Sequence, residues 1–216
     1  MTELKYVVFD FDGTIADTLD LALKLYNKVA HEYNCKPVSQ TDREIIRSGK
    51  PQELLKAYGV SRIKLFSIML RMRKELSKHI AETELINDIE TSLYEIKNAG
   101  YKLGILTSNS RENVRKFLER NSLSDIIDFI YSGNSLFGKD KVIRRMLNRE
   151  NIAGQSIVYI GDETRDVEAC KRAGIPVMAV SWGLSSREAL ASMLPDQIAD
   201  EPKELVSCVE RIFKQY

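Results

Sequence analysis

Residues 6–14 read Tyr-Val-Val-Phe-Asp-Phe-Asp-Gly-Thr, and this stretch decides the fold. Four consecutive apolar residues, Tyr6 to Phe9, are typical of a buried parallel strand, because neither face of such a strand meets water. Asp10 and Asp12 follow at once and are two residues apart, so the pleat of an extended chain directs both carboxylates to the same side. Ligands of open α/β sheets bind at the carboxyl ends of strands, and the sequence therefore predicts a site here.

Four further apolar runs have the same character and alternate with helical patterns. They span residues 103–106, 126–131, 157–160 and 177–180. Strands that alternate with helices indicate βαβ units and a parallel sheet. Two of the intervening helices are expected to stop at Gly100 and Gly174, because glycine readily adopts the left-handed conformation that ends a helix. The sequence therefore predicts an α/β fold built on a parallel sheet.

The region between the first two strands has a different, helical pattern. No run between residues 15 and 85 resembles a strand, and apolar residues recur there at helical spacing. One basic helix is expected over residues 62–79. We expect a helical segment inserted into the α/β domain. Residues 16–85 would form this helical domain, and residues 1–15 and 86–216 would form the sheet domain.

Composition and charge narrow the class of protein. Lys and Arg total 32 against 31 for Asp and Glu, a formal net charge of +1, so bulk binding of nucleic acid is not expected. We find no signal-peptide core and no apolar stretch of about 20 residues, so a membrane partner is not expected either. The three cysteines, Cys35, Cys170 and Cys208, are odd in number and form no CxxC motif, which is typical of reduced thiols in the cytoplasm.

A second acidic cluster repeats the arrangement of the first. Residues 161–166 read GDETRD and follow an apolar run, with two aspartates four residues apart at the expected start of a helix. Carboxylates crowded at neighbouring strand ends repel one another unless a cation or a proton lies between them. Mg²⁺ prefers oxygen ligands, usually one or two carboxylates together with waters. We therefore predict a Mg²⁺ site drawn from both clusters, with the candidate ligands Asp10, Asp12, Asp162 and Asp166.

Two further positions suit an anionic group. Residues 107–109 (Thr-Ser-Asn) follow the second apolar run and precede a helix, so they offer hydroxyl and backbone N–H groups to an anion. Lys139 falls at the centre of the apolar stripe of a later helix, whereas Lys141 falls on the opposite face. A charge on the core side needs an anionic partner, so Lys139 is the preferred candidate and Lys141 the alternative.

The chain resembles the haloacid dehalogenase superfamily of phosphohydrolases. That family carries four motifs: DxDGT, a Thr or Ser after the second core strand, a Lys, and GDxxxD. Here they correspond to residues 10–14, Thr107, Lys139 and residues 161–166, in the family's order. The resemblance implies a three-layer, Rossmann-like parallel sheet with an inserted α-helical cap over residues 16–85. It is greatest to phosphoglycolate-phosphatase-like members.

The resemblance also implies roles for individual residues in a Mg²⁺-dependent phosphatase. Asp10 would attack phosphorus and form an aspartyl-phosphate, and Asp12 would act as general acid and then as general base. The metal would be bound by Asp10, the Asp12 carbonyl and Asp162, with Asp166 beside them. Thr107 and Lys139 would hold the phosphoryl oxygens, and the remaining residues expected to contact substrate are Gly13, Thr14, Ser108 and Asn109. The expected partner and substrate is a small-molecule phosphate monoester similar to phosphoglycolate or to a sugar phosphate.

Other functions remain open at this point. Residues 133–139 satisfy the GxxxxGK pattern of a nucleotide-binding P-loop, but Asp140 follows in place of the Ser or Thr that would bind Mg²⁺. Within the family, sugar phosphomutases carry a cap histidine close after DxDGT, where this chain has Ala-Leu at residues 22–23. A phosphonate hydrolase would need a Schiff-base lysine, for which Lys50 and Lys56 are candidates. A non-catalytic binding protein is the remaining alternative.

The choice of substrate would depend on the helical segment. Candidate residues for a substrate-contacting loop are Arg43, Arg47, Gly49 and Lys50. An ordinary polar turn is the simpler interpretation of this stretch. Trp182, which follows the last predicted strand, is expected to pack in the core or at an interface, with the rim of the site as the alternative.

Overall fold

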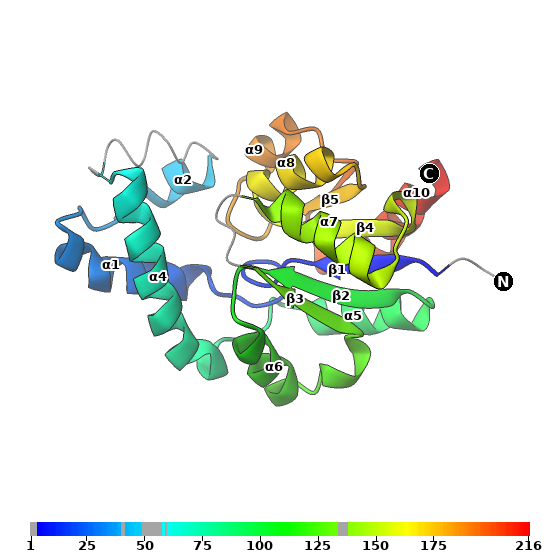
Figure 1. Cartoon of the computed structure of the whole chain (residues 1–216), viewed down its shortest axis with the longest axis horizontal. Helices are drawn as coiled ribbons and strands as arrows, with labels where there is room; N and C mark the ends of the chain where they lie inside the picture. Colours follow the sequence, from blue (N-terminus) through cyan, green and yellow to red (C-terminus); the bar gives the residue numbers. More distant parts are fainter. Residues whose placement is uncertain (1–3, 40–41, 49–57, 59, 134–137) are drawn as a thin grey trace.

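A six-stranded parallel sheet forms the centre of the molecule, in the order β3-β2-β1-β4-β5-β6 (Figure 1). The structure is a computed structural model and describes residues 4–39, 42–48, 58, 60–133 and 138–216. The strands are β1 (Tyr6–Phe9), β2 (Lys102–Thr107), β3 (Phe129–Ser132), β4 (Ile157–Gly161), β5 (Val177–Val180) and β6 (Gln197–Ala199). The chain starts at the middle of the sheet, adds β2 and β3 on one side and then returns to add β4, β5 and β6 on the other. This return places a topological switch point between β1 and β4.

Each of the five predicted apolar runs coincides with or overlaps a strand, and the observed sheet differs from the prediction in two further details. The third strand begins at Phe129 and not at residue 126, because Ser124–Ile126 forms a 3-10 turn (η3) before it. The strand β6 was not predicted. Its three residues are too few to show a hydrophobic period, and only Ala199 among them is buried.

Helices cover both faces of the sheet and also fill the long gap after β1. The α-helices are α1 (Leu19–Ala30), α2 (Asp42–Arg47), α4 (Arg62–His79), α5 (Ile89–Asn98), α6 (Arg111–Arg120), α7 (Lys139–Glu150), α8 (Thr164–Ala173), α9 (Arg187–Ser192) and α10 (Leu205–Gln215). The short 3-10 helices besides η3 are η1 (His31–Tyr33), η2 (Ile80–Glu82), η4 (Gly154–Ser156) and η5 (Pro202–Glu204). Gly100 and Gly174 have positive φ angles just after α5 and α8, as predicted for helix stops. No helix in the described part of the chain is long and apolar enough to span a membrane.

The sheet has one hydrophobic core on each face. Val7 and Phe9 belong to a core cluster with residues of α5, α6 and α10, whereas Val8 between them belongs to a second cluster with residues of α7, α8 and α9. Figure 1 shows α7 and α8 on one side of the sheet and α5 and α6 on the other. The side chains of Val7, Val8 and Phe9 are all fully buried, which explains why the strand reads as a continuous apolar run. Burial of each such side chain stabilises the fold by about 1.5–3 kcal/mol. The predicted three-layer α/β architecture is confirmed.

The described parts of residues 16–85 are largely helical, as predicted, and α1 and α4 lie beside the sheet (Figure 1). We call α1, α2 and α4 with their connections the helical insertion. It has an apolar cluster of its own, in which Val29 and Ala30 of α1 meet Ile68 of α4. The helix α4 begins where Ser61 caps it, with its side chain accepting from the backbone N–H of Lys64 at 3.2 Å.

A buried carboxylate ties two helices of the insertion together. The side chain of Glu75 on α4 is 3% exposed. It accepts from Lys28 of α1 at 3.3 Å, from Lys78 at 2.8 Å, and from Arg71. The donors Lys78 and Arg71 hold the pKa of Glu75 down to about 2. The ionised carboxylate therefore links α1 to α4 across the whole neutral pH range.

We expect Glu75→Gln to lower the melting temperature of the protein at pH 7, because the neutral amide cannot pair with three cations. The folded pKa of Glu75 lies below its ordinary value of 4.5, so its stabilising effect is complete above that pH and is lost as pH falls toward 2. The difference between wild type and variant should therefore shrink over this range in thermal melts. The matched control is Glu119→Gln on the exposed face of α6. Equal melting temperatures for Glu75→Gln and wild type at pH 7 would contradict the assignment.

Candidate active site

The chain after β1 forms a tight turn that fixes Asp10 at the carboxyl end of this central strand. The backbone N–H of Asp10 donates to the Ile160 carbonyl at 2.7 Å, which continues the pairing of β1 with β4. The carboxylate of Asp10 accepts from the N–H of Phe11 at 2.8 Å. Gly13 then reverses the chain at a φ of +77°, a conformation that glycine adopts without strain. Asp10 is thus buried and held by local structure.

The end of β4 brings a second pair of carboxylates to the same place. Carboxylate oxygens of Asp10, Asp162 and Asp166 all lie within 4.8 Å of one another. Asp162 accepts from the hydroxyl of Thr14 at 3.0 Å and from the N–H of Leu184 at 2.7 Å. Asp166 closes a capping box at the start of α8. These three buried residues could hold a metal ion. Asp12, the fourth residue of the predicted metal site, does not contribute its carboxylate to this group.

Three glycines pack so closely against two of these carboxylates that a side chain in place of any of them would collide with a carboxylate. A Cβ atom on Gly13 would lie 2.4 Å from Oδ2 of Asp162, and one on Gly183 would lie 2.3 Å from the same oxygen. A Cβ atom on Gly161 would lie 2.4 Å from Oδ2 of Asp166. The contact with Gly183 was not predicted, because nothing in a single sequence relates the loop after β5 to the loop after β4.

Lys139 joins the carboxylate that follows β1 to a carboxylate at the start of α8. Its Nζ atom lies 2.7 Å from Oδ2 of Asp10 and 2.5 Å from Oδ1 of Asp166. The ammonium group also lies over the ring of Tyr159, 5.0 Å from its centre, a favourable cation–π geometry. Lys141 is exposed on the other face of α7. The helical period of the apolar residues therefore identified Lys139 correctly as the lysine that faces inward.

The crowding of negative charge changes the proton affinities in this cluster. Burial raises the pKa of Asp10 to about 7, although Lys139 opposes the shift. The pKa of Asp162 is raised well above its usual value, first by burial and then by neighbouring carboxylates. Burial alone would lower the pKa of Lys139, but Asp10 and Asp166 hold it above its usual value. When all three acids are ionised, the charge of one ammonium is too small to balance them, and a bound cation would relieve the excess of negative charge.

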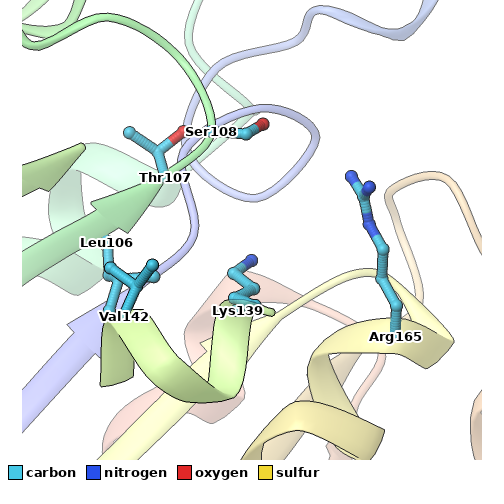
Figure 2. Close-up of a pocket in the computed structure, with 6 residues that line it drawn as sticks. All are labelled: Leu106, Thr107, Ser108, Lys139, Val142 and Arg165. Carbon is cyan, nitrogen blue, oxygen red and sulfur yellow. The ribbon is translucent and has the colours of Figure 1, made fainter. Parts of the chain in front are cut away.

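A small hollow lies above Lys139. It is lined by Leu106, Thr107, Ser108, Lys139, Val142 and Arg165. Figure 2 shows Lys139 rising from the start of α7, between the loop that carries Ser108 and the side chain of Arg165. The guanidinium of Arg165 pairs with Glu163, while its buried Nε has no partner among the described residues. Arg165 was not predicted as a site residue, although it lies inside the GDETRD stretch.

The end of β2 and the turn after it place Asn109 in direct contact with Asp12. Thr107 is 2% exposed, and its hydroxyl oxygen accepts from the N–H of Asn109 at 3.0 Å. The side-chain amide of Asn109 donates to both carboxylate oxygens of Asp12, each at 3.2 Å. Burial raises the pKa of Asp12 to about 6, and hydrogen bonds from Asn109 and Thr18 limit the shift.

The structure thus gathers the predicted residues from the ends of β1, β2 and β4 and the start of α7. Trp182 is partly buried, packs against the core and also lies at this site, since its Nε1 donates to the Thr14 carbonyl at 3.2 Å. Among the candidates in the helical insertion, Arg47 contacts the loop after β5 by donating to the Ser181 carbonyl at 3.2 Å. Gly49, Lys50, Lys56 and the side chain of Arg43 lie outside the described residues, as does part of the P-loop-like stretch, residues 134–137.

Comparison with known proteins identifies the family. The family model of haloacid dehalogenase-like hydrolases matches residues 7–180, and the chain belongs to this family. It is 28% identical over 212 residues to a phosphoglycolate phosphatase of Synechococcus elongatus, with 98% of this chain and all of the relative covered. It is 23% identical over 216 residues to the pyrophosphatase PpaX of Bacillus mycoides, with 97% of this chain and 99% of the relative covered. These full-length relatives are phosphatases, and the chain is an enzyme of their kind.

Solved structures share the fold. A crystal structure described as a predicted phosphatase from Clostridium acetobutylicum matches with a TM-score of 0.82 and 22% identity, covering 97% of this chain and all of the other. A haloacid dehalogenase-like hydrolase from Streptococcus pneumoniae matches with a TM-score of 0.76 and 24% identity, covering 96% of this chain and 99% of the other.

We expect Gly183→Ala to disturb the carboxylate cluster, because the new methyl group would collide with Asp162. Such overpacking costs about 1–3 kcal/mol of stability and should displace the carboxylate from the N–H of Leu184. The measurement is the rise in melting temperature on adding a divalent cation, Mg²⁺ or Mn²⁺, which should be greatly reduced in the variant.

The control for this variant is Gly100→Ala, where an added Cβ meets nothing within 4 Å. Its φ of +91° makes alanine strained there, so this variant should also lose stability. It should nevertheless keep the full cation-induced rise. If both variants kept it, Gly183 would have no part in shaping the cation site.

Proposed function

We propose that this protein is a Mg²⁺-dependent phosphatase that hydrolyses a small phosphate monoester through an aspartyl-phosphate intermediate. The observation that carries the proposal is the cluster formed by Asp10, Asp162, Asp166 and Lys139 at the carboxyl ends of β1 and β4. It combines a buried nucleophile candidate with a cation and with oxygen ligands for a metal. Family membership and the names of the full-length relatives support the same reaction class.

The proposed metal ligands are Asp10, the Asp12 carbonyl and Asp162, with Asp166 beside them. The donor set fits a hard cation, since all candidate ligands are oxygen atoms and their negative charge exceeds that of Lys139. When bound, Mg²⁺ would neutralise charge on the carboxylates and on the phosphoryl group. Thr14 and Leu184 hold Asp162 in place by donating to its two oxygens, so its carboxylate is oriented before any ion arrives.

The proposed reaction has two steps. In the first, a carboxylate oxygen of Asp10 bonds to phosphorus while the ester P–O bond breaks, and Asp12 gives its proton to the leaving oxygen. In the second, water attacks phosphorus, Asp12 takes a proton from that water, and the bond between Asp10 and phosphorus breaks. A pKa of about 6 suits Asp12 to both duties near neutral pH. Lys139, Thr107 and Ser108 would hold the phosphoryl oxygens.

We also propose that residues 16–85 act as a cap domain over a core of residues 1–15 and 86–216. Two contacts of α2 support this: Arg47 donates to the Ser181 carbonyl, and its own carbonyl accepts from the N–H of Ser186 at 2.6 Å. The same loop supplies the N–H of Leu184 to Asp162. A cap attached there would exclude water and select the leaving group. The cytoplasm is the proposed compartment, in keeping with three free, buried thiols.

The proposed substrate carries a second anionic group close to the phosphoryl group. Arg165 lines the hollow beside Lys139, and its pKa is raised, first by Glu163, so it stays charged. Lys139 already pairs with two carboxylates, whereas Arg165 pairs with Glu163 alone and its buried Nε has no partner among the described residues, so Arg165 keeps a donor for another part of the substrate. Phosphoglycolate and pyrophosphate, the substrates in the relatives' names, both have such a group.

The first test is hydrolysis of 4-nitrophenyl phosphate with and without Mg²⁺. We expect activity that needs the metal and falls by about 10³-fold or more in Asp10→Asn, because the amide cannot serve as nucleophile. Asp125→Asn, an exposed change in η3, should keep full activity. Retention of activity by Asp10→Asn would refute the mechanism, and a rearranged sugar phosphate with no released phosphate would favour a mutase.

A second test concerns the proposed substrate class. Arg165→Gln should raise KM for phosphoglycolate or pyrophosphate about tenfold, because an anionic group loses its charged partner. It should change kcat/KM for 4-nitrophenyl phosphate, which lacks that group, by less than about twofold. Arg172→Gln, at an exposed position of the same helix, is the control. Equal losses of kcat/KM with all the substrates would show that Arg165 does not bind a second anionic group of the substrate.

A further inference from the structure

We infer that Asn109 is a positioning residue that orients Asp12, and that Asn113 in turn fixes Asn109. This inference rests on the proposed function, because it concerns the group that would protonate the leaving oxygen. It departs from the expectation that Asn109 contacts substrate. Asn109 is 3% exposed and Asn113 is 4% exposed, so both amides lie inside the protein.

The hydrogen bonds of Asn109 are taken up by the protein itself. Its Nδ2 atom donates to both oxygens of Asp12 at 3.2 Å. Its Oδ1 atom accepts from the N–H of Ser110 at 2.8 Å and from Nδ2 of Asn113 at 2.9 Å. Its carbonyl accepts from the hydroxyl of Ser132 at 2.5 Å. An amide with two donors on its oxygen and a carboxylate on its nitrogen has little capacity left for a substrate.

The backbone N–H of Ser110 and the side-chain amide of Asn113 together determine which end of the Asn109 amide faces Asp12. An amide group has nearly the same shape when its oxygen and nitrogen are exchanged, so its orientation depends on its partners. Two N–H donors, from Ser110 and Asn113, point at one end and can only be satisfied by oxygen. The nitrogen is thereby turned toward Asp12, where only a donor can satisfy a carboxylate.

The helix α6 provides a rigid base for this pair. Ser110 caps the helix by accepting from the N–H of Asn113 at 3.1 Å. The next residues that face inward, Val114 and Phe117, are fully buried in the core beneath. Phe117 packs edge-on against Phe11, with ring centres 5.0 Å apart, and Phe11 lies between Asp10 and Asp12. The same helix therefore supports the acidic turn through its core face and Asp12 through its first turn.

The two possible roles of Asn109 predict different dependence on the leaving group. A residue that binds the phosphoryl group affects every phosphate ester alike. A residue that orients the general acid matters most when the leaving oxygen is a strong base and needs a proton, as in an alkyl phosphate. It matters least for 4-nitrophenyl phosphate, whose leaving group departs readily as an anion.

The experiment compares kcat/KM for an alkyl phosphate and for 4-nitrophenyl phosphate in Asn109→Ala and Asn113→Ala. We expect both variants to lose about 10- to 100-fold on the alkyl ester and less than about threefold on the aryl ester. The variant Asp12→Asn supplies the reference pattern, a larger loss in the same direction. Asn121→Ala, at the other end of α6, removes a side-chain hydrogen bond to the Phe117 carbonyl and is the matched control for folding.

The outcomes separate this inference from the proposed function. Equal losses on both esters, or no loss, in Asn109→Ala and Asn113→Ala would overturn the inference while Asp12→Asn still shows selective loss. Absence of hydrolysis of both esters by the wild type with Mg²⁺ would overturn the proposed function together with the inference. If Asn113→Ala proves unfolded in thermal melts, Asn113→Ser makes a smaller change at the same position and must show the same selectivity for the alkyl ester.

Discussion

The ion pairs of Lys139 with Asp10 and Asp166 are the constraint on which the rest of the site depends. Asp10, just after β1, and Asp166, in the first turn of α8, lie at 2.7 and 2.5 Å from one ammonium group, in a region almost closed to solvent. Such a group is stable only if every charge keeps its partner, because an unpaired buried charge is strongly destabilising. The sheet order makes this possible, since β1 and β4 are neighbours although 147 residues lie between the end of β1 and the start of β4. The chemistry of the site therefore depends directly on the topology.

Buried carboxylates have opposite electrostatic surroundings at the site and in the helical insertion. At the site, carboxylates outnumber the cation, and the pKa values of Asp10 and Asp162 rise because burial penalises their ionised forms. In the helical insertion, three cations surround Glu75 and lower its pKa. At the site, the excess of negative charge can bind a cationic ligand. In the helical insertion, Glu75 already has three cationic partners, and these ion pairs join α1 to α4.

The sequence predicted the fold well because the sheet is buried on both faces. Continuous apolar runs marked five strands, whereas β6 at the edge was too short and too polar to give a signal. The sequence also predicted which side chains lie near one another, since the carboxyl ends of parallel strands share one edge. It could not predict their partners. That Asn109 turns to Asp12, and that Gly183 packs on Asp162, depends on how loops from distant strands meet, which periodicity does not encode.

The position of the loop after β5 makes the intrinsic fluorescence of the protein sensitive to the site. Trp182 is the only tryptophan of the chain, and its indole N–H donates to the carbonyl of Thr14 in the acidic turn. Two residues later, the N–H of Leu184 holds Asp162. The fluorescence of the whole protein above the tyrosine band therefore originates at the rim of the site. Any event that shifts this loop will change the emission of a single, known chromophore, without a label and without a substrate that changes colour.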